Sequence, residues 1–323
     1  MKTNQKIVEY IRRHRQVSGK ELADHLGITD RGVRKQLLSL LKEGVLTKKG
    51  HPPVVYYLLN ENTIYVVPHK VQASVTQIIN DNYLYIAPNG EKISGMRGFE
   101  SWCQKQQLPL EKTAIEYVFM YRKFSRYKNR GFINGLQKLK NTFDMVFLDK
   151  AYYLDFYSID RFGKTKLGLL LLYAKQSQEL VLMNELIDLL SPAIEKLIQQ
   201  HHITSVGFIP PTIRRQLQFM TVLKNRLRLG VRFIEIKKIK SDVSVPQKSL
   251  GKLADRIENA SQSIVVKDKS KHNNVLLIDD AVGSGATLNE TARQLRERGM
   301  VKGKIIGLAI VGSYKGFDVI SEI

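Results

Sequence analysis

Residues 275–295 read VLLIDDAVGSGATLNETARQL, and this stretch decides the fold of the C-terminal half. The apolar run of residues 275–278 is typical of a strand that is buried on both faces of a parallel sheet. Two aspartates, Asp279 and Asp280, end the run, and small residues follow them. Thr287 and Glu290 then fit a capping box at the start of a helix. The stretch therefore predicts a strand, an acidic pair, a small-residue loop and a helix, in that order.

The order of these elements also predicts a ligand. The N-terminus of a helix offers unpaired N–H groups and the positive end of a dipole, which together attract a phosphate. Ionised carboxylates accept hydrogen bonds from neighbouring hydroxyl groups. A ribose 5-phosphate satisfies both halves of such a site. The loop lacks the lysine of a Walker loop, and Leu288 stands where a dinucleotide fingerprint needs its third glycine.

The stretch resembles the phosphoribosyl pyrophosphate loop of type I phosphoribosyltransferases, in which an apolar strand, two aspartates and a Gly-x-Thr turn follow one another. The resemblance implies that Asp279 and Asp280 hold the ribose hydroxyls. It also implies that the 5-phosphate is bound by the loop residues Gly283, Ser284, Gly285, Ala286 and Thr287. Gly283 departs from the family pattern, in which a threonine is common, so one hydroxyl donor is lost. The alternative is an ordinary turn between a strand and a helix.

The composition favours a polyanionic partner and a reducing compartment. The chain of 323 residues has a formal net charge of +21 and a pI near 9.8, which favours a polyanionic partner. A basic protein whose charge serves only solubility is the alternative. The single cysteine, Cys103, excludes an internal disulfide and is typical of the cytoplasm. The longest apolar run, residues 167–174, is too short to cross a bilayer, and the first ten residues lack the apolar core of a signal peptide. We therefore expect a cytoplasmic protein with no membrane partner, and the scattered histidines predict no metal site.

The first sixty residues follow the pattern of a winged helix-turn-helix domain. Three short amphipathic helices are predicted, and Ser18 and Thr29 stand at the starts of the second and the third. Two strands around residues 48–53 then form a hairpin. In this pattern residues 3–59 resemble the winged helix family.

Basic side chains occur at two places in this expected domain. In helix-turn-helix proteins the third helix enters the major groove, which makes Arg31, Arg34 and Lys35 candidate nucleic-acid contacts. Lys48 and Lys49, expected at the tip of the wing, are candidates for contacts with backbone phosphates. A winged helix that binds another protein is the alternative.

Residues 61–140 are expected to form a small α+β segment whose fold the sequence does not identify. A hairpin is predicted at residues 83–93, around Pro88-Asn89-Gly90. Helices are expected near residues 98–103 and 111–124.

The same segment ends in a basic stretch. Seven basic residues and no acidic residue occur between Arg122 and Lys140, with aromatic residues among them. Such a stretch predicts binding to a single strand or to RNA through phosphates and stacking. A solvated basic helix face explains the stretch equally well.

Residues 141–323 predict an α/β domain in which a parallel sheet is flanked by helices. Strands are expected at residues 145–148, 167–172, 205–209, 231–234, 275–278 and 305–310. Helices are expected at residues 180–199 and 215–229. Ligands of such sheets bind beyond the carboxyl ends of the strands.

The order of these elements resembles the competence protein F type of phosphoribosyltransferase, over about residues 165–311. In that family the loop after an earlier strand binds pyrophosphate, which implies this role for Pro210, Pro211, Thr212 and Arg215. Residues 245–256 resemble its flexible region over the site. The resemblance also implies Mg²⁺, bound through the pyrophosphate of the ligand. For Arg215, an ordinary surface charge is the alternative.

Three functions fit this combination, and the sequence identifies no catalytic residue that would decide between enzyme and binding protein. The chain resembles effector proteins of some retron anti-phage systems, which partner a reverse transcriptase and its RNA–DNA hybrid. It also resembles the purine repressor of Gram-positive bacteria, a ligand-sensing regulator that binds duplex DNA. A salvage phosphoribosyltransferase is the third hypothesis, which the first sixty residues disfavour. We favour the effector, as a monomer or an oligomer; a reaction at this site would be displacement at the anomeric carbon of ribose.

Overall fold

The structure is a computed structural model that describes residues 3–60, 71–213, 215–239, 245–246 and 249–314. The chain divides into two compact units, Met1–Val71 and Gln72–Ile323. The fold is mixed α/β, as the sequence predicts, with a small helical N-terminal unit and a large sheet in the second unit. Each unit is described by itself.

The N-terminal unit has three helices and a three-stranded antiparallel sheet of order β1-β3-β2. Its elements are α1 (Thr3–His14), β1 (Gln16–Ser18), α2 (Gly19–Leu26), α3 (Asp30–Lys42), β2 (Leu46–His51) and β3 (Val54–Leu59). A capping box of Ser18 and Glu21 starts α2, and the Thr29 side chain accepts a hydrogen bond from the Gly32 N–H at the start of α3. Apolar side chains from all three helices, among them Ile11, form one buried core. This arrangement exposes the opposite face of α3.

The C-terminal unit begins with a small helical subdomain. Its elements are α4 (Ala73–Asn82), β4 (Leu84–Ile86), β5 (Lys92–Ser94), α5 (Gly95–Lys105) and α6 (Leu110–Ser125). The predicted hairpin is present, since β4 and β5 pair in antiparallel fashion. Aromatic rings fill the centre, where Phe99 lies edge-on to Tyr83, with ring centroids 4.9 Å apart, and also contacts Tyr117.

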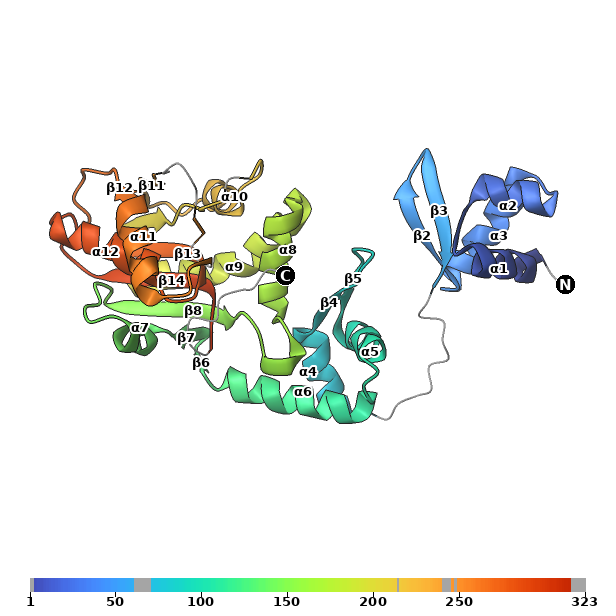
Figure 1. Ribbon diagram of the computed structural model, residues 1–323, viewed down its shortest axis with the longest axis horizontal. Coiled ribbons are helices and arrows are strands. Elements are labelled where there is room, and N and C mark those ends of the chain that lie inside the picture. Colours follow the sequence, from blue (N-terminus) through green and yellow to red (C-terminus); the bar gives the residue numbers. More distant parts are fainter. Residues whose placement is uncertain (1–2, 61–70, 214, 240–244, 247–248, 315–323) are drawn as a thin grey trace. The chain divides into compact units, whose positions relative to one another are not determined.

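A seven-stranded sheet of order β10-β9-β13-β14-β8-β7-β6 organises the rest of this unit (Figure 1). Strands β10 to β8 in this order are parallel, whereas β7 and β6 add an antiparallel hairpin at one edge. The bounds are β6 (Lys128–Asn129), β7 (Phe132–Asn134), β8 (Lys150–Phe156), β9 (Ser205–Phe208), β10 (Arg232–Ile234), β13 (Val275–Val282) and β14 (Ile305–Gly312). Strands β9 and β14 are buried throughout and β13 is buried at residues 275–278, as expected of a sheet covered on both faces.

Helices cover both faces of this sheet (Figure 1). The elements are α7 (Leu136–Thr142), the short 3₁₀ helix η1 (Asp160–Phe162), α8 (Lys166–Ser177), α9 (Leu180–Gln200), α10 (Phe219–Arg226), α11 (Leu253–Ser263) and α12 (Ala286–Glu297). On one face, α8, α9 and α10 pack against Leu276, Ile278 and Leu308. On the other face, Gly307 lies against Leu148 and against Leu288 of α12. Strands β11 (Ile236–Lys238) and β12 (Ile264–Val266) form a separate, two-stranded antiparallel sheet.

Two of the strands that the sequence predicts do not form in the structure. Residues 145–148 are irregular, and residues 167–172 lie in α8. A short apolar run fits a buried strand and a buried helix equally well. The helix forms because the Thr165 side chain caps it, and because a helical period places Leu170, Leu171 and Ala174 on the buried side.

The expected boundary at residue 141 also differs from the structure. Strands β6 and β7 precede it in the chain, yet β7 pairs with β8 and belongs to the large sheet. The described sheet therefore begins at Lys128. Residues 61–70 of the expected middle segment lie outside the described residues. Among the helices that are described, none combines the length and the apolar character needed to cross a bilayer.

Candidate functional site

The candidate pocket lies where the strand order of the large sheet reverses. After β9 the chain adds β10 on one side, and after β13 it adds β14 on the other side. Strands β9 and β13 are paired neighbours, with Phe208 opposite Ile278. The segments that leave their carboxyl ends therefore diverge and open a crevice, which is the place where open α/β sheets bind ligands.

A cavity of about 160 Å³ occupies this crevice. One wall is the segment after β9, which contains the predicted pyrophosphate residues Pro210, Pro211, Thr212 and Arg215. The other wall is the end of β13 and the loop after it, with all the residues predicted to hold a ribose 5-phosphate: Asp279, Asp280, Gly283, Ser284, Gly285, Ala286 and Thr287. The structure thus brings the two predicted groups of residues together in one cavity.

The acidic pair lies inside β13, which continues to Val282 rather than ending at residue 278. Successive side chains of a strand point to opposite faces. Asp280 lies on the α8 side, where its Oδ2 is 2.7 Å from Lys175 Nζ. Asp279 lies on the other side, and its Oδ1 accepts a hydrogen bond of 2.8 Å from the backbone N–H of Asp280. Each aspartate therefore has a different environment.

Burial shifts the pKa values of Asp279 and of the neighbouring Lys238 in opposite directions. Burial, and then the negative charge of Asp280, raises the pKa of Asp279 to about 8. Burial lowers the pKa of Lys238, an effect that the charge of Asp279 opposes. Lys238 Nζ also donates a 2.7 Å hydrogen bond to Thr212 Oγ1, so that β11 is tied to the wall after β9. A ligand with negative charge would find a cation beside each aspartate.

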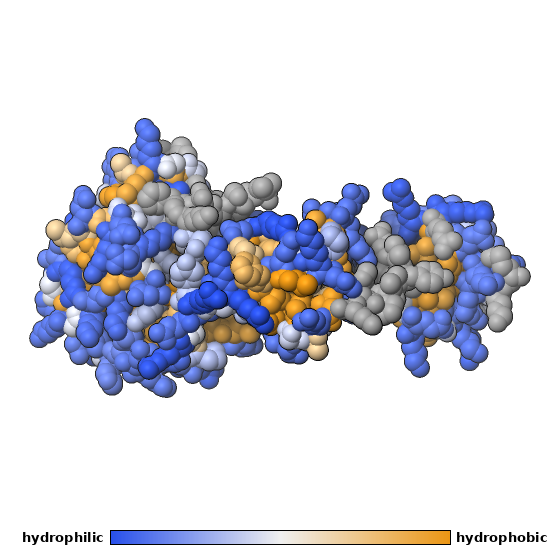
Figure 2. Space-filling view, turned by 90° about the horizontal axis from the view of Figure 1, so that it is seen from below, coloured by the Kyte–Doolittle hydropathy of each residue, from blue (hydrophilic) through white to orange (hydrophobic). Residues whose placement is uncertain are grey.

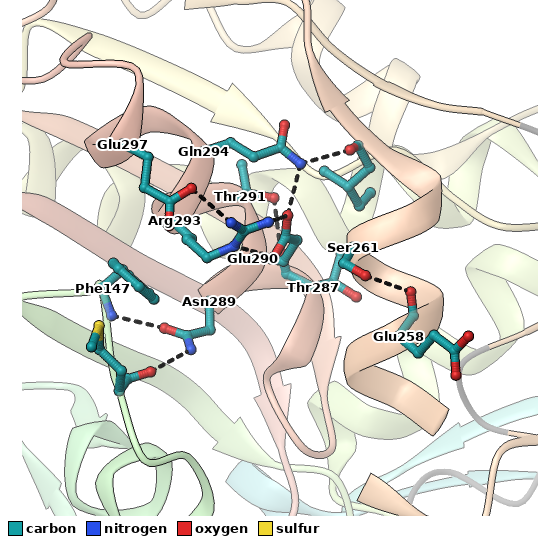
Figure 3. A network of polar contacts seen from close by, with 12 residues as sticks. Phe147, Glu258, Ser261, Thr287, Asn289, Glu290, Thr291, Arg293, Gln294 and Glu297 are labelled. Carbon is teal, nitrogen blue, oxygen red and sulfur yellow. Dashed lines mark hydrogen bonds and ion pairs between the residues drawn. The ribbon is translucent and has the colours of Figure 1, made fainter. Parts of the chain in front are cut away.

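The loop after β13 differs in detail from the predicted capping box. Helix α12 starts at Ala286, with Gly285 as its cap at φ 86°, and the Ser284 hydroxyl accepts a 3.3 Å hydrogen bond from the Ala286 N–H. Glu290 lies in the second turn of the helix, and its carboxylate accepts hydrogen bonds from Arg293 and Gln294 (Figure 3). The predicted box of Thr287 and Glu290 is therefore wrong. The first residues of the helix still line the cavity, as the predicted phosphate site requires.

Helix α7 supports this loop from below. The Leu139 side chain lies so close to Gly285 that a Cβ at this position would overlap it. Lys138 Nζ donates a 3.1 Å hydrogen bond to the Ser313 carbonyl, and the Ser313 N–H donates one of 3.2 Å to the carbonyl of Val282. The loop is thus held between α7 and the end of β14.

Three cations of the cavity were not predicted as such from the sequence. Lys175 comes from the helix that the sequence predicts as a strand, and Lys238 comes from a short strand that it does not predict. Arg256 is buried, and its Nε donates a 2.7 Å hydrogen bond to the Leu250 carbonyl. The sequence signal for Arg256 is its place in the expected flexible region, of which residues 247–248 lie outside the described residues.

The second candidate surface is α3 of the N-terminal unit. Arg31, Arg34 and Lys35 are all exposed, and Leu38, next on the same face, is 67% exposed. Lys48 and Lys49 are exposed as well, but they lie within β2. Their predicted place at the wing tip is wrong, because both strands continue to a turn at residues 52–53.

Comparison with known families supports the assignment of this unit. The family model described as HTH domain matches residues 3–52 of the chain. No curated protein matches the chain. The matched residues cover α1 to β2, including the exposed face of α3. The N-terminal unit is therefore a winged helix-turn-helix domain, a fold that supports binding to nucleic acid.

Proposed function

We propose that the chain is a nucleic-acid-binding protein whose C-terminal unit holds phosphoribosyl pyrophosphate or a related nucleotide in a phosphoribosyltransferase-like pocket. One observation carries the proposal: an acidic pair and a helix-start loop occupy the same cavity at the switch point of a parallel sheet. The carboxylates suit a vicinal diol, and the loop suits a phosphate.

The opposite wall of the cavity suits a second phosphate group. Thr212 and Lys238 are already joined by a hydrogen bond, and Arg215 lines the same wall. We assign them to the pyrophosphate of the ligand. Within the described residues no cluster of three or more acidic, histidine or cysteine side chains suits a metal ion. Mg²⁺ would therefore be held mainly by the ligand, next to Asp279 and Asp280, and would neutralise the pyrophosphate.

For the biological role we propose an effector of a retron-type anti-phage system, which acts with a reverse transcriptase and an RNA–DNA hybrid. The helix-turn-helix domain and the net charge of +21 support a polyanionic partner of this kind. If the pocket is catalytic, its residues position the ribose and stabilise the departing pyrophosphate while an acceptor attacks the anomeric carbon.

A ligand-sensing regulator is the second candidate, and the pairing of Lys175 with Asp280 favours it. A ribose hydroxyl that bonds to Asp280 would compete with Lys175 of α8. Ligand binding would then change a contact between the pocket and a helix, as a sensor requires. A reverse transcriptase gene beside this one would support the effector, and neighbouring purine genes would support the regulator.

The pocket is tested by removing both carboxylates. Asp279→Asn combined with Asp280→Asn should weaken binding of phosphoribosyl pyrophosphate by roughly 30-fold or more, since a hydrogen bond to the charged Asp280 contributes about 1.5–3 kcal/mol and one to the protonated Asp279 about 0.5–1.5 kcal/mol. Isothermal titration calorimetry in the presence of Mg²⁺ measures the affinity. Glu297→Gln, an exposed change at the end of α12, serves as the control and should bind like the wild type.

Unchanged affinity in the double variant would refute the pocket assignment. Release of pyrophosphate from labelled phosphoribosyl pyrophosphate would separate the two roles, because an effector enzyme turns the ligand over. Binding without release supports the regulator.

A further inference from the structure

A second basic surface lies on the C-terminal unit, on α6 and the turn that follows it. Its residues are Phe119, Arg122, Lys123, Arg126 and Tyr127, which we call the α6 stripe. Spacings of three and four residues place them on one side of the helix and its end. Phe119 lies about 9 Å along the axis from the helix end at Ser125, at 1.5 Å per residue, and Tyr127 follows in the turn. The stripe thus places three cationic side chains between two aromatic ones.

The cations of the stripe are available to a partner. Arg122, Lys123 and Arg126 are exposed, and none of them forms an ion pair within the part of the chain that the structure describes. Two other basic residues of the same stretch have structural partners. Lys128 Nζ lies 3.2 Å from Asp155 Oδ2, and Lys138 binds Ser313. The structure thus uses two of the seven charges of this stretch and leaves the other five exposed, three of them on the α6 stripe.

The aromatic side chains are exposed to an unusual degree. Phe119 is 69% exposed and Tyr127 is 48% exposed. Figure 2 views the molecule from the side of α6 and shows apolar and strongly hydrophilic side chains next to each other there. The acidic side chain nearest in sequence, Glu116, is ion-paired with Arg161 and so adds little negative potential.

The Tyr127 ring is also held in place. Its hydroxyl lies 3.0 Å from the Tyr314 hydroxyl, and its ring lies edge-on to Phe156 at a centroid distance of 5.7 Å. A ring that is fixed before binding loses little side-chain entropy when a base stacks on it. The hydrogen bond to Tyr314 raises the pKa of the Tyr127 hydroxyl.

We propose that the α6 stripe binds a single strand of DNA or RNA, with bases stacked on Phe119 and Tyr127 and phosphates held by the three cations. Stacking on a protein ring requires an unpaired base, whereas a duplex offers only its backbone to such a surface. This site is separate from α3 of the helix-turn-helix domain, and it does not depend on what the pocket binds.

The test uses the full chain with Arg34→Ala and Lys35→Ala as a background, so that α3 contributes less. Fluorescence anisotropy measures binding of labelled oligo(dT), oligo(U) and a blunt duplex. Phe119→Ser and Tyr127→Ala should each weaken single-strand binding by roughly 5- to 150-fold, the range that corresponds to loss of one stacked base. Tyr127→Phe keeps the ring and its contact with Phe156 but loses the hydrogen bond to Tyr314, so it should retain most of the affinity of the background.

Cation removal gives an independent readout. Lys123→Ala with Arg126→Ala should reduce the slope of log affinity against log salt by about 0.7 for each lost phosphate contact. Lys105→Ala with Lys112→Ala, which removes two exposed cations from α5 and the start of α6, is the matched control and should leave the slope unchanged. Comparing oligo(dT) with oligo(U) shows which strand is preferred.

Two results would overturn the proposal. One is an affinity for the duplex equal to that for the single strands in the background protein. The other is unchanged single-strand binding in Phe119→Ser, an exposed position where the substitution leaves the core intact.

Discussion

At the scale of single residues, the two adjacent aspartates show how position alone separates two identical side chains. Asp280 has a lysine partner on the α8 side of β13, whereas Asp279 lies on the more enclosed side next to Lys238. The sequence predicted that both line a binding site, because consecutive acids after a buried strand lack a structural purpose. It did not predict the lysines, which come from distant parts of the chain.

The raised pKa of Asp279 makes stability depend on pH. In the folded state Asp279 stays protonated to about pH 8, whereas in the unfolded chain it ionises near the ordinary aspartate pKa of 3.8. The unfolded state therefore binds fewer protons in this window, and this group's contribution to stability is present below pH 3.8 and is lost as the pH rises toward 8.

Urea unfolding at pH 5 and pH 8 checks this expectation. The wild type should lose more stability between these two values than Asp279→Asn, which cannot ionise. Asp255→Asn, an exposed change on α11, should behave like the wild type. Equal losses in all three proteins would show that Asp279 is already ionised in the folded state.

At the scale of elements, a long helical period was predicted reliably, whereas short apolar runs gave mixed results. Helix α9 agrees closely with its predicted range, since its apolar positions follow a long helical period. Strand β14 agrees as well, although its continuous apolar run has no period. The run that forms α8 was predicted as a strand because six apolar positions fit both periods. That error also hid Lys175, which reaches Asp280 only from a helix.

The start of α12 shows the limit of a local motif. Thr287 and Glu290 match a capping box in sequence, yet Gly285 caps the helix. Packing decides the outcome, since α7 contacts the loop at Leu139 and leaves room only for a glycine. A tertiary contact of this kind has no signature in the loop sequence itself.

Gly285→Ala tests this contact between α7 and the phosphate loop. The substitution combines a positive φ of 86° with overlap against Leu139, so we expect a loss of about 1–3 kcal/mol in stability and weaker ligand binding. Gly299→Ala is the matched control, because it has φ 58° but only an ordinary contact with Lys271. Thermal unfolding and calorimetry measure the two effects. If both variants lose the same stability, backbone strain alone explains the glycine.

At the scale of the whole molecule, the sequence predicted many of the helices and strands, whereas only the structure shows which of them lie next to each other. Strands, helices and the winged helix-turn-helix domain follow from local patterns. The pairing of β9 with β13 does not follow from local patterns, because more than sixty residues separate the two strands. Neither strand has a sequence feature that identifies the strand with which it pairs. The rule that ligands bind at carboxyl ends therefore predicted the edge of the sheet, and only the strand order located the crevice.

The nucleic-acid function of the N-terminal unit can be measured separately from that of the pocket. Arg34→Ala with Lys35→Ala should weaken duplex DNA binding and reduce the slope of log affinity against log salt by about one for each lost phosphate contact. Lys6→Ala, an exposed change on α1, is the control and should keep the slope of the wild type. A slope that does not change in the double variant would mean that α3 faces a protein partner.

The order of strands in the large sheet has a consequence for how the protein is made. Strand β14 is the last of the described strands in chain order, yet it lies between β13 and β8. While a ribosome translates the residues between β8 and β14, the edge of β8 that will receive β14 has no partner. An unpaired strand edge promotes association with other chains. The nascent protein thus completes the centre of its sheet only after β14 has left the ribosome, and until then it depends on dilution or chaperones to stay unassociated.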